Sequence, residues 1–312
     1  MREFTRANRF AMAMLVVMIL GSGIVSAITA WLQVEGILTR YILTYALQFA
    51  LPLCVYFFLY RDHSPKQVLR LKKTKGYTYV LTVIFAFAIQ PLLMCLSSLS
   101  TMIFHNYLND SIQGYLKEPW WAVLLATALI PAVMEELVCR GVYLSGCRRW
   151  NIYMAAALNG VFFGVLHLNP QQAVYAALFG FFCALITLGA DSLWPAMLAH
   201  FIINGTQILM AFGAQALAGQ DSFLGRLFVE MQKEESLWKA LPVSLLLAGL
   251  AVWCLIRIYY VNGRQELLRG KRVEGWTMKE APLKASERFE GLCWLGGVVL
   301  IFITLSCMVG MA

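Results

Sequence analysis

Long apolar runs alternate with short polar segments along almost the whole chain. A helix that crosses ~30 Å of hydrocarbon needs ~20 predominantly apolar residues, and runs of about that length occur nine times. They lie near residues 10–32, 41–60, 79–104, 120–149, 152–168, 172–189, 194–215, 237–260 and 291–311. The pattern predicts an all-α fold, a polytopic transmembrane helix bundle of about nine spans.

Composition supports lipid as the solvent of this chain. Of its 312 residues 60% are hydrophobic and 13% are charged, whereas soluble domains have about 45–50% and about 25%. The net charge of +8 does not indicate a nucleic-acid partner, because the basic residues lie in the loops between apolar runs. We expect membrane lipid as a partner of these loops, and no nucleic acid. The first run is too long for a signal-peptide core and is predicted to be a retained span.

Lysine and arginine distribution predicts the orientation of the spans. With the N-terminus inside, the cytoplasmic segments hold nineteen of these residues and the opposite side holds five. We therefore place the N-terminus in the cytoplasm and the C-terminus outside. We therefore expect an integral, multi-pass membrane protein, which would lie in the cell membrane if the source is prokaryotic. Residues 262–290 read either as an amphipathic loop on the cytoplasmic membrane surface or as a solvated linker.

Ionisable side chains at membrane depth cost at least ~2.5–3.5 kcal/mol each and point to a function. In this chain they concentrate between residues 135 and 204. Residues four apart share a helix face, so Glu136 and Arg140 in the fourth run are predicted to form an ion pair. Glu135 lies about 100° round the helix and remains available for chemistry, beside a kink expected at Pro131. The alternative is a purely architectural Glu–Arg cluster.

The second group of polar residues is centred on His167 in the fifth run. Gly160 and Gly164 form a G-x-x-x-G pattern that lets another helix approach closely. Glu135 lies 15 residues before the turn at Trp150, and His167 lies 17 residues after it. At a rise of about 1.5 Å per residue, both side chains are roughly 22–26 Å from that turn. The sequence thus places a carboxylate beside an imidazole, as general-base activation of water requires.

The third group is His200 and Asn204 in the seventh run. They are four residues apart, share a helix face and offer hydrogen-bond donors toward one point. This suits an oxyanion hole, and the histidine also suits metal ligation. Straight ideal helices would leave His200 several ångströms from the level of Glu135 and His167, so the site requires a bend, a tilt or a stagger of the spans.

These three groups, in this order and on separate helices, resemble the CPBP family of intramembrane proteases. That family comprises type II CAAX prenyl proteases and related bacteriocin-processing proteins, and its patterns are E-E-x-x-x-R, F-x-x-x-H and H-x-x-x-N. The matching residues here are Glu135, Glu136, Arg140, Phe163, His167, His200 and Asn204. The resemblance covers about residues 120–208. We therefore expect spans one to three in 1–119, a CPBP-like catalytic core in 120–208 and C-terminal spans in 209–312, with the first three and last two spans peripheral.

The resemblance implies an endopeptidase, a hydrolase that cuts peptide bonds of membrane-associated peptides. Glu135 and His167 would activate water, and His200 and Asn204 would stabilise the oxyanion. The ion pair of the first group would be an internal scaffold, in agreement with its spacing. A prenylated C-terminal segment is one substrate class. In a prokaryote, a peptide precursor, a bacteriocin leader or a signalling pheromone fits better.

Zinc is the alternative at the same site, with Glu135, His167 and His200 as its three protein ligands. However, the H-E-x-x-H spacing is absent, and the sequence shows no acidic partner for either histidine. We therefore favour a metal-independent glutamate peptidase without a cofactor, in which a buried glutamate acts as the base.

Two further classes of protein use buried polar residues. A proton-coupled transporter would relay protons through the same Glu and His residues, but neither an inverted repeat nor paired broken helices are visible. A non-catalytic immunity protein on this scaffold would need no catalytic residues, so the complete set of polar residues argues against it.

Overall fold

The computed structural model describes residues 2–61, 64–104, 114–217 and 234–270 and six single positions, and within these it contains helices and no strand. Helical elements that follow one another without a break form the second span, Ile37–Leu59, and the fourth span, Trp120–Gly146. The helical elements are α1 (Arg2–Trp31), α2 (Ile37–Tyr45), η1 (Ala46–Ala50), α3 (Leu51–Leu59), α4 (Pro65–Val68), α5 (Gly76–Thr101), α7 (Trp120–Leu124), η2 (Leu125–Leu129), α8 (Ile130–Glu136), η3 (Leu137–Tyr143), α9 (Leu144–Gly146), α10 (Ile152–Leu166), α11 (Pro170–Ala190), α12 (Trp194–Leu217), α14 (Glu234–Val261) and α15 (Gln265–Leu268).

In the described part of the chain, seven helices are long and apolar enough to cross a membrane. The chain is an all-α, integral, multi-pass membrane protein, as predicted. The fifth predicted run differs, because α10 has only 15 residues and at about 1.5 Å each spans roughly 22 Å. The ninth predicted run, 291–311, and most of the loop 262–290 lie outside the continuously described residues.

The shortness of α10 follows from the chemistry at its two ends. Asn151 caps its start, where the side-chain oxygen accepts a hydrogen bond from the Met154 amide at 2.8 Å. After α10 ends, Leu168 adopts a left-handed φ of 48°. Asn169 then caps α11 through the Gln171 amide at 3.0 Å, and Pro170 occupies the first turn, where its missing N–H costs nothing. A tight reversal at these residues therefore separates α10 from α11.

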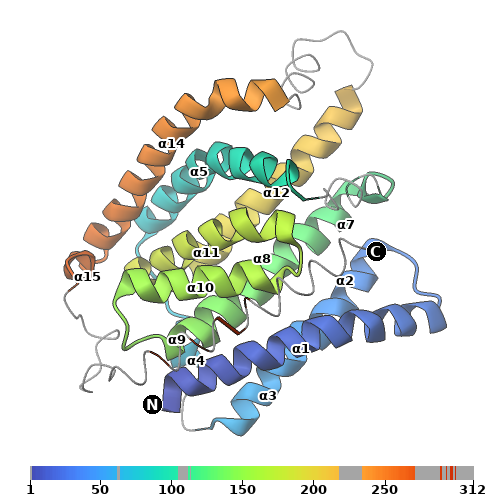
Figure 1. Cartoon of the computed structure of the whole chain (residues 1–312), viewed down its shortest axis with the longest axis horizontal. Coiled ribbons are helices and arrows are strands. Elements are labelled where there is room, and N and C mark those ends of the chain that lie inside the picture. The colour runs from blue at the N-terminus through green and yellow to red at the C-terminus, as the bar shows by residue number, and fades with distance from the viewer. Residues whose placement is uncertain are drawn as a thin grey trace.

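The composite fourth span, α7 to α9, runs through the middle of the bundle (Figure 1). It packs against α1 and α2 on one side and against α12 on another. The hairpin of α10 and α11 lies alongside it, and α5 and α14 pack together beyond that hairpin (Figure 1). Polar groups on the fourth span are therefore enclosed by protein, which is where a bilayer tolerates them.

Three turns of the second and fourth spans are π-helical, which the sequence did not predict. Two of these turns, η1 and η2, each end two residues before a proline, Pro52 and Pro131. Proline has no N–H for the carbonyl four residues earlier, and wide turns of this kind insert where the α-helical ladder is broken. The expected irregularity at Pro131 is thus a π-helical turn on its N-terminal side.

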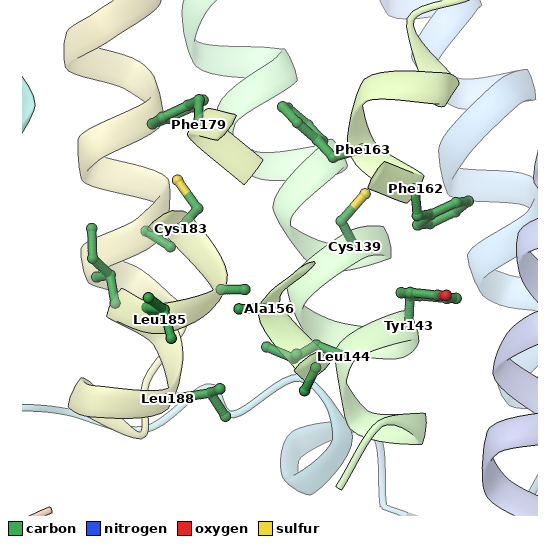
Figure 2. Packing of buried hydrophobic residues seen from close by; sticks show 14 of the residues in the cluster. Cys139, Tyr143, Leu144, Ala156, Phe162, Phe163, Phe179, Cys183, Leu185 and Leu188 are labelled. Atoms are coloured by element: carbon green, nitrogen blue, oxygen red, sulfur yellow. The ribbon is translucent and has the colours of Figure 1, made fainter. Parts of the chain in front are cut away.

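The core around the fourth span is closely packed. Figure 2 shows Tyr143 and Cys139 of the fourth span facing Phe162 and Phe163 of α10, and the rings of Tyr143 and Phe162 are 4.4 Å apart. The close approach of α10 and α11 depends on glycine. A Cβ on Gly160 would lie 2.5 Å from the Ala177 carbonyl oxygen. The G-x-x-x-G interpretation of this helix is therefore confirmed by its contact with α11.

Asp191, directly after α11, joins three loops at one end of the bundle. It forms ion pairs with Arg70, Lys72 and Arg264, the last at 3.2 Å. Asp191 has a left-handed φ of 48°, which Asp tolerates better than most residues. Burial, reinforced by the charge of Arg148, lowers the pKa of Arg70 to about 10. All four basic side chains belong to segments that the sequence assigns to one side of the membrane.

Candidate active site

The ion pair predicted from helix spacing, between Glu136 and Arg140, is present and lies beside the site. Arg140 Nη1 donates to Glu136 Oε1 at 2.8 Å, and both side chains are completely buried. The guanidinium also lies over the ring of Phe163, with its carbon 4.2 Å from the ring centre. A buried carboxylate and a buried cation are thus paired within one span, and an aromatic face of α10 covers the cation.

Glu136 has a second partner that the sequence did not reveal. His200 Nδ1, on α12, lies 2.9 Å from the same Oε1 atom. The statement that neither histidine has an acidic partner was therefore wrong. The two residues are 64 positions apart on different spans, so no local spacing encodes their contact. Because Oε1 also accepts a hydrogen bond from Arg140, it is a carboxylate acceptor and His200 Nδ1 is the donor.

This contact fixes what His200 presents to the rest of the site. Its other nitrogen, Nε2, lies 3.9 Å from Glu135 Oε2, so His200 does reach the level of Glu135 despite the stagger expected for straight helices. With Nδ1 protonated toward Glu136, Nε2 can donate a hydrogen bond only when the ring carries both protons.

Glu135 has different neighbours on its two oxygens. Tyr45, from the second span, donates its hydroxyl to Oε1 at 2.7 Å, while Oε2 is the oxygen that faces His200. The first three spans are therefore not peripheral, since one of them contacts the predicted base. A tyrosine repeated at i and i+4 in an apolar run, Tyr41 and Tyr45, was the signal that the sequence offered for this contact.

His167 follows the last residue of α10 and is held through one nitrogen. Its Nδ1 lies 2.8 Å from the carbonyl oxygen of Phe163. A carbonyl oxygen can only accept, so Nδ1 carries the proton and Nε2 is left with a lone pair. The Phe163 ring packs edge-on against His167, with centres 4.8 Å apart. The imidazole therefore has a set tautomer and a set orientation.

Asn204 is held by the fourth span. Its side-chain nitrogen Nδ2 donates to the carbonyl oxygen of Thr127 at 3.2 Å. Thr127 lies four residues before Pro131, so its carbonyl is the one that loses its α-helical partner to that proline. The second N–H of the Asn204 amide remains for another acceptor. Pro131 thus contributes to the site by freeing the Thr127 carbonyl for Asn204.

Two cavities meet at these residues. One has a volume of about 370 Å³ and lies between α1, the second span and α10. The other, of about 200 Å³, extends toward α5, α11 and α12 and is lined by His200 and Asn204 as well as Thr127 and Tyr115. The residues that line both cavities are Tyr41, Tyr45, Glu135 and His167. Glu135 and His167 were expected at one level, and they do border the same spaces.

The two candidate zinc-binding histidines are oriented alike. Both histidines hold Nδ1 against an acceptor and leave Nε2 toward other groups, as metal-binding histidines do. In the part of the chain that the structure describes, however, no three His, Cys, Asp or Glu side chains come close enough together to hold a metal ion. Glu135, His167 and His200 therefore do not form a ready ligand set in this arrangement.

Comparison with known families identifies the segment that carries the site. Residues 117–206 match the family model described as type II CAAX prenyl endopeptidase Rce1-like. Comparison with curated proteins and with solved structures gave no match. The matched segment contains all three polar motifs and nearly coincides with the predicted core at 120–208. The chain is therefore an intramembrane endopeptidase of the CAAX type, a hydrolase. Over these residues the chain is similar to the CAAX protease family that its three motifs resemble.

Proposed function

We propose that Glu135 and His167 activate a water molecule that attacks a peptide bond of a membrane-associated peptide. The observation that carries this proposal is their position on the border of the same two cavities. His167 Nε2, with its lone pair, orients the water, and Glu135 takes a proton from it as the oxygen bonds to the carbonyl carbon. The Glu135 proton then passes to the departing amine as the carbon–nitrogen bond breaks. The products are a carboxylic acid and an amine, which ionise to a carboxylate and an ammonium group.

His200 and Asn204 stabilise the oxyanion that forms on the carbonyl oxygen. Both line the cavity of about 200 Å³ that Glu135 and His167 also border. The charged form of His200, held by Glu136, donates through Nε2, and Asn204 donates through the N–H that is not bound to Thr127. Glu136 and Arg140 support the site by fixing the position and protonation of His200. In a prokaryote the protein would work in the cell membrane, on a peptide precursor, leader or pheromone.

Hydrolysis of a membrane peptide by the purified protein in detergent tests the proposal. Glu135→Gln and His167→Ala should each abolish cleavage while the peptide still binds, because they remove the groups that act on water. His200→Ala and Asn204→Ala should keep residual turnover, since the loss of one oxyanion donor costs about 10²–10³ in rate. Full activity of Glu135→Gln would refute the proposed mechanism.

A zinc peptidase at the same residues is the second candidate. The observation that favours it is the hydrogen bond between Glu136 and His200 Nδ1 at 2.9 Å, because a carboxylate in this position orients many metal-binding histidines. Glu135, His167 and His200 would hold the ion, which would lower the pKa of a bound water.

A further inference from the structure

The two oxygens of Glu135 are in different environments. Oε1 accepts the Tyr45 hydroxyl hydrogen at 2.7 Å, a short distance typical of a hydrogen bond to a carboxylate. Oε2 lies 3.9 Å from His200 Nε2, too far for a hydrogen bond. One oxygen is thus held by protein, and the other faces the part of the site where the oxyanion groups lie.

Tyr45 is itself held in place by its neighbours on the same span. Its ring stacks on Phe49 with centres 4.8 Å apart and planes 26° apart. On its other side the Tyr41 ring is 6.2 Å away at 24°, and Tyr41 is in turn bound to Tyr115 through their hydroxyls at 2.7 Å. A ring fixed on both faces presents its hydroxyl in one direction, so the Tyr45 hydroxyl sets the rotation of the Glu135 carboxylate rather than following it.

We propose that Tyr45 is a positioning residue for the general base: it holds Glu135 Oε1 and thereby turns Oε2 toward the water and the substrate carbonyl. This inference rests on the proposed function of Glu135. Tyr45 lies outside residues 117–206, the segment that matches the family model. The second span therefore contributes to an active site whose proposed catalytic residues, Glu135, His167, His200 and Asn204, all belong to that segment.

Tyr45→Phe tests the proposal, because it removes only the hydroxyl and keeps the stacked ring. We expect kcat to fall by about 10–100-fold with KM unchanged, since a misplacement of about 1 Å at a reacting group can cost 10²-fold in rate. Tyr259→Phe is the matched control. Tyr259 is fully buried and, like Tyr45, donates a hydrogen bond, to the Leu185 carbonyl at 2.9 Å, but on α14 it contacts none of the site residues named above. Its variant should lose thermal stability and keep kcat.

A thermal double-mutant cycle measures the Tyr45–Glu135 contact without any activity assay. Tyr45→Phe should lower the melting temperature of the wild-type protein but not that of Glu135→Ala, because the acceptor is then already gone. Equal decreases in both backgrounds would overturn the contact. Wild-type kcat in Tyr45→Phe, with Glu135→Gln inactive, would overturn the positioning role alone. Full activity of Glu135→Gln would overturn the proposed function and this role with it.

Discussion

The side-chain amide of Asn204 bonds at 3.2 Å to the carbonyl of Thr127, which Pro131 leaves without its α-helical donor. A proline in one span thus creates the attachment point for a site residue of another. Buried backbone carbonyls need a partner, and here the partner is a side chain that the proposed chemistry also uses. Asn159 of α10 also donates to a carbonyl of the fourth span, that of Cys139 in the π-helical turn η3, at 2.7 Å, although this carbonyl accepts the Leu144 amide as well.

Pro131→Ala should restore an amide at position 131 that competes with Asn204 for the Thr127 carbonyl. We expect the melting temperature to stay the same or to rise, because alanine is the better helix former. The value of kcat should nevertheless fall, by at most the ~10²–10³ of a lost oxyanion donor. Pro52→Ala is the control, since Pro52 follows η1 as Pro131 follows η2 but frees no carbonyl for a site residue. Equal kcat in both variants would contradict this role of Pro131.

Arg140→Ala should leave Glu136 as an unpaired charge in a completely buried position. Breaking a buried ion pair in this way costs about 3–5 kcal/mol, so we expect a low yield of folded protein and a strongly reduced melting temperature. Arg269→Ala breaks the exposed pair with Glu266 and should cost less than about 1 kcal/mol. Thermal unfolding in detergent compares the two variants. Similar melting temperatures would mean that the Glu136 ion pair is not a scaffold.

Gly160→Ala should destabilise the hairpin of α10 and α11. The added methyl group would lie 2.5 Å from the Ala177 carbonyl oxygen and 2.9 Å from the Phe181 amide nitrogen. Both are backbone atoms that cannot rotate away, so we expect a loss of about 1–3 kcal/mol and lower activity, because His167 follows α10. Gly249→Ala on α14 meets no atom within 4 Å and should be neutral or slightly stabilising. Melting curves of the two variants measure the difference.

Chelation separates the two catalytic candidates. If Glu135 is itself the base, protein freed of metal by chelator and checked by metal analysis should cleave at the wild-type rate. A zinc enzyme would lose activity on chelation and regain it when Zn²⁺ is added. If zinc is bound in a one-to-one ratio and its content follows the activity, the zinc mechanism replaces the glutamate mechanism. The protein would still be an endopeptidase.

Reporter fusions test the orientation of the spans. A reporter inserted after Arg149 should be cytoplasmic, and one inserted after Lys117 should be external, because of the lysine and arginine asymmetry. The contacts of Asp191 with Arg70, Lys72 and Arg264 require the three loops to share one side. A fusion after Arg264 should therefore report the same side as one after Arg149. Opposite results for these two would contradict the arrangement.

What the sequence predicted well were relationships within one helix. The spacing of Glu136 and Arg140 predicted their ion pair, and Gly160 with Gly164 predicted a close helix contact, because the period of the α-helix converts spacing directly into geometry. Counting residues on either side of Trp150 also brought Glu135 and His167 to the same cavities. In each case the inference needed only local helical geometry.

Specific contacts between side chains of different spans were the ones that the sequence did not predict. The bond from His200 to Glu136 and that from Tyr45 to Glu135 join residues 64 and 90 positions apart, and their geometry depends on how whole helices pack. The π-helical turns were also missed. Each adds a residue to a turn and so changes which side chains face the site, and no short sequence pattern specifies that.

The bundle is fastened very differently at its two ends. At one end Asp191 and its three basic partners tie together the loops before α5, between α11 and α12, and after α14. Separating these loops would break the three ion pairs of Asp191. At the other end, the second span and the segment before α7 meet through the hydroxyls of Tyr41 and Tyr115, both of which line the cavity beside His200 and Asn204. The end of the bundle beside the cavity is thus joined by a neutral hydrogen bond between two tyrosines, whereas the opposite end is joined by charged pairs.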